Sequence, residues 1–142
     1  MTAVSPSNAD SAPALDASML SASLTVSDLP ASVAWYRDVL GLTVTREFER
    51  DGVLFAVSLL AGAVPVLLTR DDGAKGQDRA KGEGISLRFT TSTDIDALAA
   101  RAKSAGAVLD SEPMDGFGAR FFRVRDPDGF RLVVSSKQKP AG

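Results

Sequence analysis

The 142-residue sequence contains neither cysteine nor histidine. The missing cysteine excludes disulfides, thiolate nucleophiles and cysteine-based zinc sites. The missing histidine removes the commonest general base and the commonest transition-metal ligand. Catalysis therefore has to depend on carboxylate, amine, guanidinium, phenol, hydroxyl or backbone groups, and any metal has to be held by oxygen ligands.

The sequence also lacks a strong excess of charge and a long apolar run. Its formal net charge is -2, which argues against the basic face that a nucleic-acid partner needs. No apolar run is long enough to span a membrane, and the first residues lack the basic and apolar regions of a secretory signal. These absences predict no nucleic-acid partner, no membrane partner and, by default, a cytoplasmic location.

The length and composition are typical of one globular domain. Hydrophobic residues make up 44% and charged residues 24% of the chain. A chain of this size buries about two-thirds of its unfolded surface and needs no disulfide or metal for stability. Residues 1–18 are rich in Ser, Ala, Pro and Asp, so we expect a disordered N-terminal tail. The domain is expected at residues 19–136, followed by a C-terminal tail at 137–142.

A strand–helix–strand–strand–strand pattern fills the first half of this domain. Residues 20–27 alternate between apolar and small polar side chains, as in a strand with one buried face. Ser27 or Asp28 can cap a helix that ends at Gly41. The strands that follow are predicted at residues 42–49, 53–60 and 64–69.

The same pattern returns after a linker that is rich in Gly and charge, at residues 70–83. Its strand is expected at 84–90, and its helix runs from Asp94 to Gly106. The last strands are predicted at residues 107–110, 119–125 and 130–135. The repeat predicts an α+β fold with two βαβββ modules, at 19–69 and 84–136. Their sheets are expected to form a curved, half-open mixed β-sheet barrel, with the helices outside and polar strand faces along a cleft.

Two stretches, LTVSDLPASVAWYRDVLGLTV and RVRDPDGFRLVV, carry a family resemblance. Together with the repeat, they resemble the vicinal oxygen chelate superfamily, which holds the glyoxalase I, bleomycin-resistance and extradiol-dioxygenase proteins. That superfamily includes isomerases, dioxygenases, epimerases, thiol transferases and non-catalytic drug binders, so the fold alone implies no single activity. In its bleomycin-resistance branch two chains often pair near the cleft, and the resemblance therefore implies a homodimer.

Metal-using members of this superfamily place His, Gln or Glu ligands at particular strand positions. The resemblance carries these positions to Ser21, Leu67, Gly84 (or Glu83, if the alignment slips by one) and Val133. A hard divalent ion takes about six oxygen ligands, several of them charged. This set offers at most one carboxylate and one hydroxyl. The resemblance therefore implies a metal-free member with no cofactor.

The alternation along each strand predicts which side chains line the cleft. The candidate ligand-binding residues on the strands are Ser21, Ser23, Leu67, Ser86, Arg88, Arg131 and Val133. They combine hydroxyls, an apolar floor and guanidiniums, which suits a ligand with an apolar or aromatic body and a carboxylate, phosphate or carbonyl handle. Alternatively, the two apolar side chains fill the barrel and the hydroxyls only face water.

Three further features have two interpretations each. Trp35 could stack on a planar ligand at the cleft edge, or it could pack between helix and sheet or at a dimer contact. Phe117 stands between two glycines and could be an aromatic lid or the exposed tip of a hairpin. Arg88, Arg123 and Arg131 could cluster to bind an anion, or each could face solvent separately.

No catalytic residue is predicted. Two carboxylate pairs, Glu47 with Glu49 and Asp126 with Asp128, have no convincingly placed His or Lys neighbour and fit surface charge and turn formation. The preferred hypothesis is metal-independent binding of a small molecule in the cleft, as in bleomycin-resistance proteins. A lyase or isomerase without the usual metal site is the alternative, and an interaction module with no ligand of its own is a third option.

Overall fold

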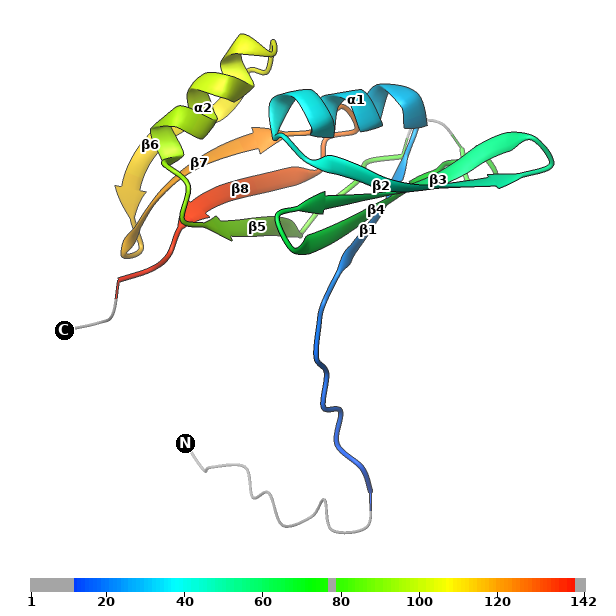
Figure 1. Cartoon of the computed structure of the whole chain (residues 1–142), viewed down its shortest axis with the longest axis horizontal. Helices are drawn as coiled ribbons and strands as arrows, with labels where there is room; N and C mark the ends of the chain where they lie inside the picture. Colours follow the sequence, from blue (N-terminus) through cyan, green and yellow to red (C-terminus); the bar gives the residue numbers. More distant parts are fainter. Residues whose placement is uncertain (1–11, 77–78, 140–142) are drawn as a thin grey trace.

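The computed structural model describes residues 12–76 and 79–139, and these form two similar halves (Figure 1). The first half consists of β1 (Ala22–Val26), α1 (Leu29–Val39), β2 (Thr43–Arg50), β3 (Val53–Ala61) and β4 (Val64–Arg70). The second half consists of β5 (Ser86–Thr91), α2 (Ile95–Ser104), β6 (Leu109–Gly116), β7 (Ala119–Arg125) and β8 (Arg131–Ser136). The predicted α+β fold with a repeated βαβββ unit is confirmed.

Each half forms its own four-stranded mixed sheet. The strand order is β1-β4-β3-β2 in the first sheet and β5-β8-β7-β6 in the second. In both sheets the first strand of the half pairs in parallel with its last strand. Among the described residues no ladder joins the two sheets, and both helices lie on the same side of them (Figure 1). The barrel is therefore open, with one sheet face left uncovered by helices.

Local sequence signals set the ends of α1. The carboxylate of Asp28 accepts a hydrogen bond from the amide of Ala31 at 3.1 Å, which satisfies one of the free donors of the first turn. Pro30 lies in that first turn, where a missing N–H costs nothing. Gly41 follows the helix with a φ of +78°, a conformation that favours glycine. The sequence thus directs the chain straight from α1 into β2.

A shared hydrophobic core lies between the helices and the sheet faces that they cover. Its buried members include Leu24, Val26, Leu29, Tyr36, Val57, Leu59, Val66, Leu68, Ile95, Ala99, Phe122, Val124, Leu132 and Val134. Burying one large aliphatic side chain contributes about 1.5–3 kcal/mol. Since neighbouring strand residues point to opposite faces, Leu132 and Val134 face the helices and Val133 faces away, as predicted. The opposite sheet face, which carries Ser23, Leu67, Ser86, Arg88, Arg131 and Val133, is called the helix-free face below.

The turn between β7 and β8 links the two halves. Tyr36 on α1 donates its phenolic hydrogen to Asp126 across 2.8 Å. Asp126 also accepts hydrogen bonds from the amides of Asp128 and Phe130, each at 2.9 Å. Burial raises the pKa of the Tyr36 phenol well above its usual range and also raises the pKa of Asp126. This turn is therefore a buried polar contact as well as a chain reversal.

The segment predicted to be a solvated linker is anchored at one residue. Lys81 donates to the carboxylate of Asp71 at 2.9 Å and to the carbonyl of Thr25 at 3.1 Å. Its ammonium also lies 3.6 Å from Asp128, and its side chain is only 9% exposed. The hydrogen bond from Lys81 lowers the pKa of Asp71. The linker is thus fixed to the end of β1 and to the β7–β8 turn.

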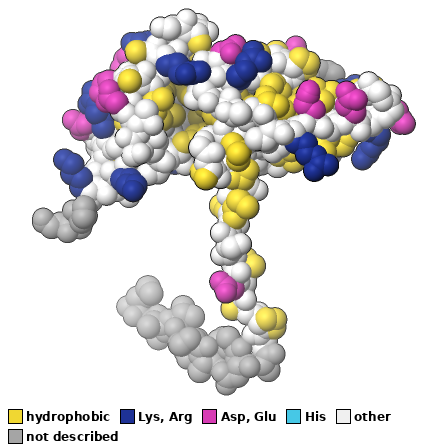
Figure 2. All heavy atoms as spheres, in the orientation of Figure 1, with side chains coloured by type: hydrophobic (Ala, Val, Ile, Leu, Met, Phe, Trp, Pro, Cys, Tyr) yellow, Lys and Arg dark blue, Asp and Glu magenta, His cyan; other side chains and the backbone are white. Residues whose placement is uncertain are grey.

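Residues 12–21 leave the body of the protein as an extended segment (Figure 1). Leu15 and Leu20 on this segment are 94% and 95% exposed, and hydrophobic side chains are visible along it (Figure 2). Residues 1–11 of the predicted N-terminal tail and 140–142 of the C-terminal tail lie outside the described residues. Neither helix of the described chain is long and apolar enough to cross a membrane.

Candidate functional site

The structure brings the predicted strand residues together within each half. The register partners are Ser23 with Leu67, Ser86 with Arg131, and Arg88 with Val133. Cross-strand partners share a face of the sheet, so the three pairs lie on the helix-free face. Ser21 is exposed and lies just before β1. The predicted set is therefore divided into a first-half group and a second-half group.

Val133 lies at the centre of the second-half group. Its register partners are Arg88 on β5 and Arg123 on β7. Arg131 precedes it by two residues on β8 and therefore points to the same face. The Val133 side chain is only 7% exposed, whereas the three arginines are exposed. A position expected for a metal-ligand carboxylate is thus apolar and surrounded by positive charge.

Two residues further along β8 and two residues back along β7, the side chains on the same face form a buried floor beside these arginines. Ser135 and Phe121 are register partners in this floor, and both are buried. Arg88 donates from Nη1 to the Ser135 hydroxyl at 3.1 Å. The guanidinium carbon of Arg123 lies 4.9 Å from the centre of the Phe121 ring, within cation–π range. Two guanidiniums therefore lean over a floor made of one hydroxyl and one aromatic ring.

These arginines have no carboxylate partner in the described part of the chain. Within residues 12–76 and 79–139, Arg88, Arg123 and Arg131 form no ion pair. In contrast, Arg125 on the same β7 strand donates to Asp110 at 2.8 Å. Strand spacing places the backbones of Arg88 and Arg123 about 10 Å apart, close to the screening length of about 8 Å at physiological salt. Their repulsion is only partly screened, so the face favours an anion.

Phe117 lies at the edge of this site and Trp35 lies elsewhere. Phe117 is 75% exposed at the tip of the β6–β7 hairpin, with a φ of +53°. Its ring centre is 6.3 Å from that of Phe121, so it extends the apolar surface. Trp35 packs against the core and meets Tyr36 edge-on at 4.9 Å. The structure does not bring Trp35 together with the strand residues.

The positions expected for metal ligands hold an unsuitable set of donors. Ser21 and Glu83 are exposed and stand before the first strands of their halves. Leu67 and Val133 carry no ligating atom, and Gly84 has no side chain. In the part of the chain that the structure describes, no three carboxylates gather where they could hold an ion. These residues do not fit a divalent cation, which takes about six oxygen ligands.

Phe121 belongs to this site, although it is not among the site residues predicted from the sequence. The signal was present in the consecutive Phe121 and Phe122. Adjacent residues of a strand point to opposite faces, so two neighbouring rings cannot both face the helices. Phe122 enters the shared core, and Phe121 forms part of the helix-free face.

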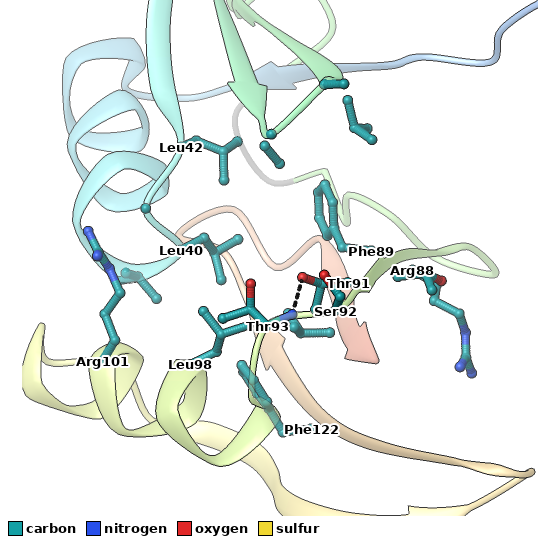
Figure 3. A pocket seen from close by; sticks show the side chains of 18 of the residues that line it. Leu40, Leu42, Arg88, Phe89, Thr91, Ser92, Thr93, Leu98, Arg101 and Phe122 are labelled. Atoms are coloured by element: carbon teal, nitrogen blue, oxygen red, sulfur yellow. Dashed lines mark hydrogen bonds between the residues drawn. The ribbon is translucent and has the colours of Figure 1, made fainter. Parts of the chain in front are cut away.

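A cavity of about 610 Å³ lies on the other side of the sheets, between the two halves. Its wall includes the end of α1, the β3–β4 turn, the end of β5 and the first turns of α2 (Figure 3). Arg88 is the one predicted site residue that borders the cavity, and its side chain points away from it (Figure 3). Sequence patterns within one half could not reveal this space, because it forms where the halves meet.

Known proteins share this sequence pattern and fold. The sequence model of the Glyoxalase/Bleomycin resistance protein/Dioxygenase superfamily matches residues 18–134. A Vibrio cholerae protein named "Probable lactoylglutathione lyase" is 30% identical over 128 residues, which cover 84% of this chain and 91% of that protein.

Solved structures agree with the fold. The glyoxylase/bleomycin resistance protein/dioxygenase domain from Frankia sp. EAN1pec matches with a TM-score of 0.70 and 24% identity, covering 89% of this chain and 96% of that one. TioX from Micromonospora sp. ML1 matches with a TM-score of 0.68 and 23% identity, covering 84% of this chain and 98% of that one. At these identities the likeness concerns the fold alone.

Proposed function

Because this chain belongs to the Glyoxalase/Bleomycin resistance protein/Dioxygenase superfamily, we propose that it binds a small anionic molecule on the helix-free face without a metal ion. The observation that carries this proposal is the placement of Val133 between Arg88 and Arg123. The valine offers no metal-ligating atom, and the two guanidiniums attract negative charge. The family fold is thereby adapted to bind an anion rather than a cation.

The surroundings of Val133 suggest the ligand class. Guanidiniums donate paired hydrogen bonds to carboxylate or phosphate oxygens, so Arg88 and Arg123 suit an anionic group. The exposed ring of Phe117 provides an aromatic surface beside them, which suits a flat apolar body. We therefore favour an aromatic acid as ligand, in line with a bleomycin-resistance-like binding protein.

A metal-free lyase or isomerase is the second candidate, because the Vibrio cholerae relative is named a lactoylglutathione lyase. Such chemistry needs a group that transfers a proton within reach of the substrate. Glu47 and Glu49 are exposed on β2, the edge strand of the other sheet. Asp126 is occupied by hydrogen bonds from Tyr36 and two amides. These placements support binding over catalysis.

We also propose a homodimer as the functional unit. The support is the extended segment at residues 12–21, where Leu15, Met19 and Leu20 are largely exposed. A second copy could cover these side chains, and burying apolar area is favourable by about 25 cal/mol per Å². The third option, an interaction module without a ligand, has less support, because it gives no role to the arginines around Val133. A cytoplasmic location stays a prediction.

A thermal-shift screen tests the binding proposal. Matched pairs such as 1-naphthoate and 1-naphthamide share an aromatic body and differ in charge. A ligand at about 100 times its Kd stabilises the folded state by about 2.7 kcal/mol. We expect the acids, and not the amides, to raise Tm, with no change on adding EDTA. Equal shifts for acids and amides, or a shift that needs a divalent ion, would contradict the proposal.

A further inference from the structure

The two halves meet at two equivalent ends, and the cavity lies at one of them. In each half, parallel pairing of the first and last strands places the turn before the last strand beside the start of the first. The β7–β8 turn at 126–130 also meets the segment just before α1, where Asp128 accepts hydrogen bonds from the amide and the hydroxyl of Ser27. The β3–β4 turn, made by Gly62 and Ala63, lines the same cavity as the loop before α2. Both ends have the same connectivity, but they differ in their side chains and in the length of the turn.

The first end is filled by a large side chain and a long turn. Tyr36 is fully buried there and donates to Asp126. Counted from the N-cap residues Asp28 and Asp94, the position of Tyr36 corresponds to Ala102 in α2. The facing β3–β4 turn carries nothing larger than a methyl group. The second end thus lacks both the phenol and the acidic turn.

The cavity has an apolar body and one hydroxyl-rich side. Its apolar lining includes Leu40, Leu42, Phe89, Leu98, Phe122 and Val134. Thr91, Ser92 and Thr93 lie together along another part of the wall (Figure 3). The Thr91 hydroxyl already accepts a hydrogen bond from the Thr93 amide at 3.0 Å. A volume of about 610 Å³ lies within the range of about 300–1,000 Å³ found for small-molecule sites.

The charged groups at this cavity do not form a built anion site. Arg101 donates to the carbonyls of Arg37 and Asp38 at the end of α1, each across 3.3 Å. These bonds satisfy carbonyls that the helix leaves free and hold the guanidinium against Gly41. Lys137 borders the cavity as an exposed side chain. The rest of the wall therefore presents apolar side chains and hydroxyls.

We propose that this cavity is a second binding site, for an uncharged aromatic molecule that carries one hydroxyl or carbonyl group. The rings contact Leu40, Phe89 and Leu98, and the oxygen meets the hydroxyls of Ser92 or Thr93. This site lies on the opposite side of the sheets from Val133 and takes a ligand of different charge. Its occupancy is independent of the anion site.

An NMR titration of the full chain with 2-naphthol tests this site. We expect saturable amide shifts at residues 62–63 and 91–93. Leu98→Trp, which fills the cavity, should weaken binding by about tenfold or more, because pocket shape alone discriminates by that order. Ala97→Trp is the matched control on the exposed side of α2 and should bind as the wild type does. Arg123→Gln alters the anion site but not the cavity wall, so it should also leave 2-naphthol binding unchanged, which separates this test from that of the anion site.

Several outcomes would overturn the proposal. One is the absence of saturable shifts, and another is a set of shifts confined to the helix-free face. A third is equal affinity in wild type and in a folded cavity-filling variant, and Ser92→Trp serves if Leu98→Trp does not fold. A fourth is a change of the same amides with protein concentration alone, which would assign the cavity to a second copy of the chain.

Discussion

Arg88 on β5 and Arg123 on β7 flank the same residue, Val133, which is the register partner of both. In the described part of the chain neither guanidinium has a carboxylate partner. Arginine stays charged at every accessible pH, so the positive charge of this face is permanent. The helix-free face therefore attracts anions and repels cations.

Val133→Glu should abolish binding of aromatic acids. The new carboxylate would lie between Arg88 and Arg123 and pair with them, as a bound anion would. Val133→Gln is the matched control, with nearly the same shape and no charge. Calorimetric titration with 1-naphthoate should show no binding to the Glu variant and weakened binding to the Gln variant. Equal loss in both variants would mean that shape, and not charge, determines binding.

Arg88→Gln and Arg123→Gln should each weaken the binding of 1-naphthoate by about tenfold to a hundredfold. A hydrogen bond to a charged group contributes about 1.5–3 kcal/mol, and 1.4 kcal/mol corresponds to tenfold in Kd. Arg125→Gln is the control, because that guanidinium is paired with Asp110 on the same sheet. If the Arg125 variant weakens binding as much as the other two, the site is not centred on Val133.

Asp126→Asn should leave the free energy of unfolding near the wild-type value at neutral pH. The amide oxygen can accept both backbone hydrogen bonds, and its NH₂ can donate to the Tyr36 hydroxyl. Asp126→Ala leaves three donors without an acceptor and should cost about 3 kcal/mol. Urea unfolding of both variants checks this difference. A similar loss in the two variants would show that the carboxylate charge is needed.

The difference in stability between the wild type and Asp126→Asn should depend on pH. The pKa of Asp126 is raised in the folded state because burial disfavours its charged form. Its contribution to stability is thus fully present below the unfolded pKa of about 3.9 and is lost as pH rises through the folded pKa. The stability of wild type relative to Asp126→Asn should fall as pH increases across that window. A relative stability that rises with pH would contradict the assignment.

Lys81→Met should lower Tm more than Lys75→Met does. Lys81 is nearly buried and joins Asp71, the carbonyl of Thr25 and the β7–β8 turn, whereas Lys75 is exposed in the same segment. Removing one partner of a buried ion pair leaves the other charge uncompensated. Thermal unfolding monitored by circular dichroism measures the difference, and equal Tm values would show that the segment is not anchored there.

The fold was predictable because each half repeats strong local signals. A helix that starts after an Asp and ends at a Gly, at 28–41 and again at 94–106, recurs with the alternating strands in the same order, and the structure confirms the two βαβββ units. The strand expected at 107–110 is instead Leu109–Gly116. It is an edge strand with a largely polar and exposed sequence, so the burial pattern that normally marks a strand is weak.

The candidate site was only partly predictable. Alternation placed Arg88, Arg131 and Val133 on one face, and the register agrees. It could not show that Arg123 stands opposite Val133 or that Lys81 is nearly buried. The register between two strands and the packing of the linker depend on contacts between distant segments, and a pattern along one strand does not encode those contacts. The cavity between the halves escaped prediction for the same reason.

Isothermal titration of the purified full chain with 1-naphthoate and, separately, with MnCl₂ tests the central claim most directly. We expect 1-naphthoate to bind in the presence of EDTA, its affinity to fall as salt rises, and its binding to be lost in Val133→Glu. We also expect no stoichiometric binding of Mn²⁺. Stoichiometric Mn²⁺ binding that is lost in Glu83→Gln, together with no binding of 1-naphthoate in EDTA, would contradict this claim.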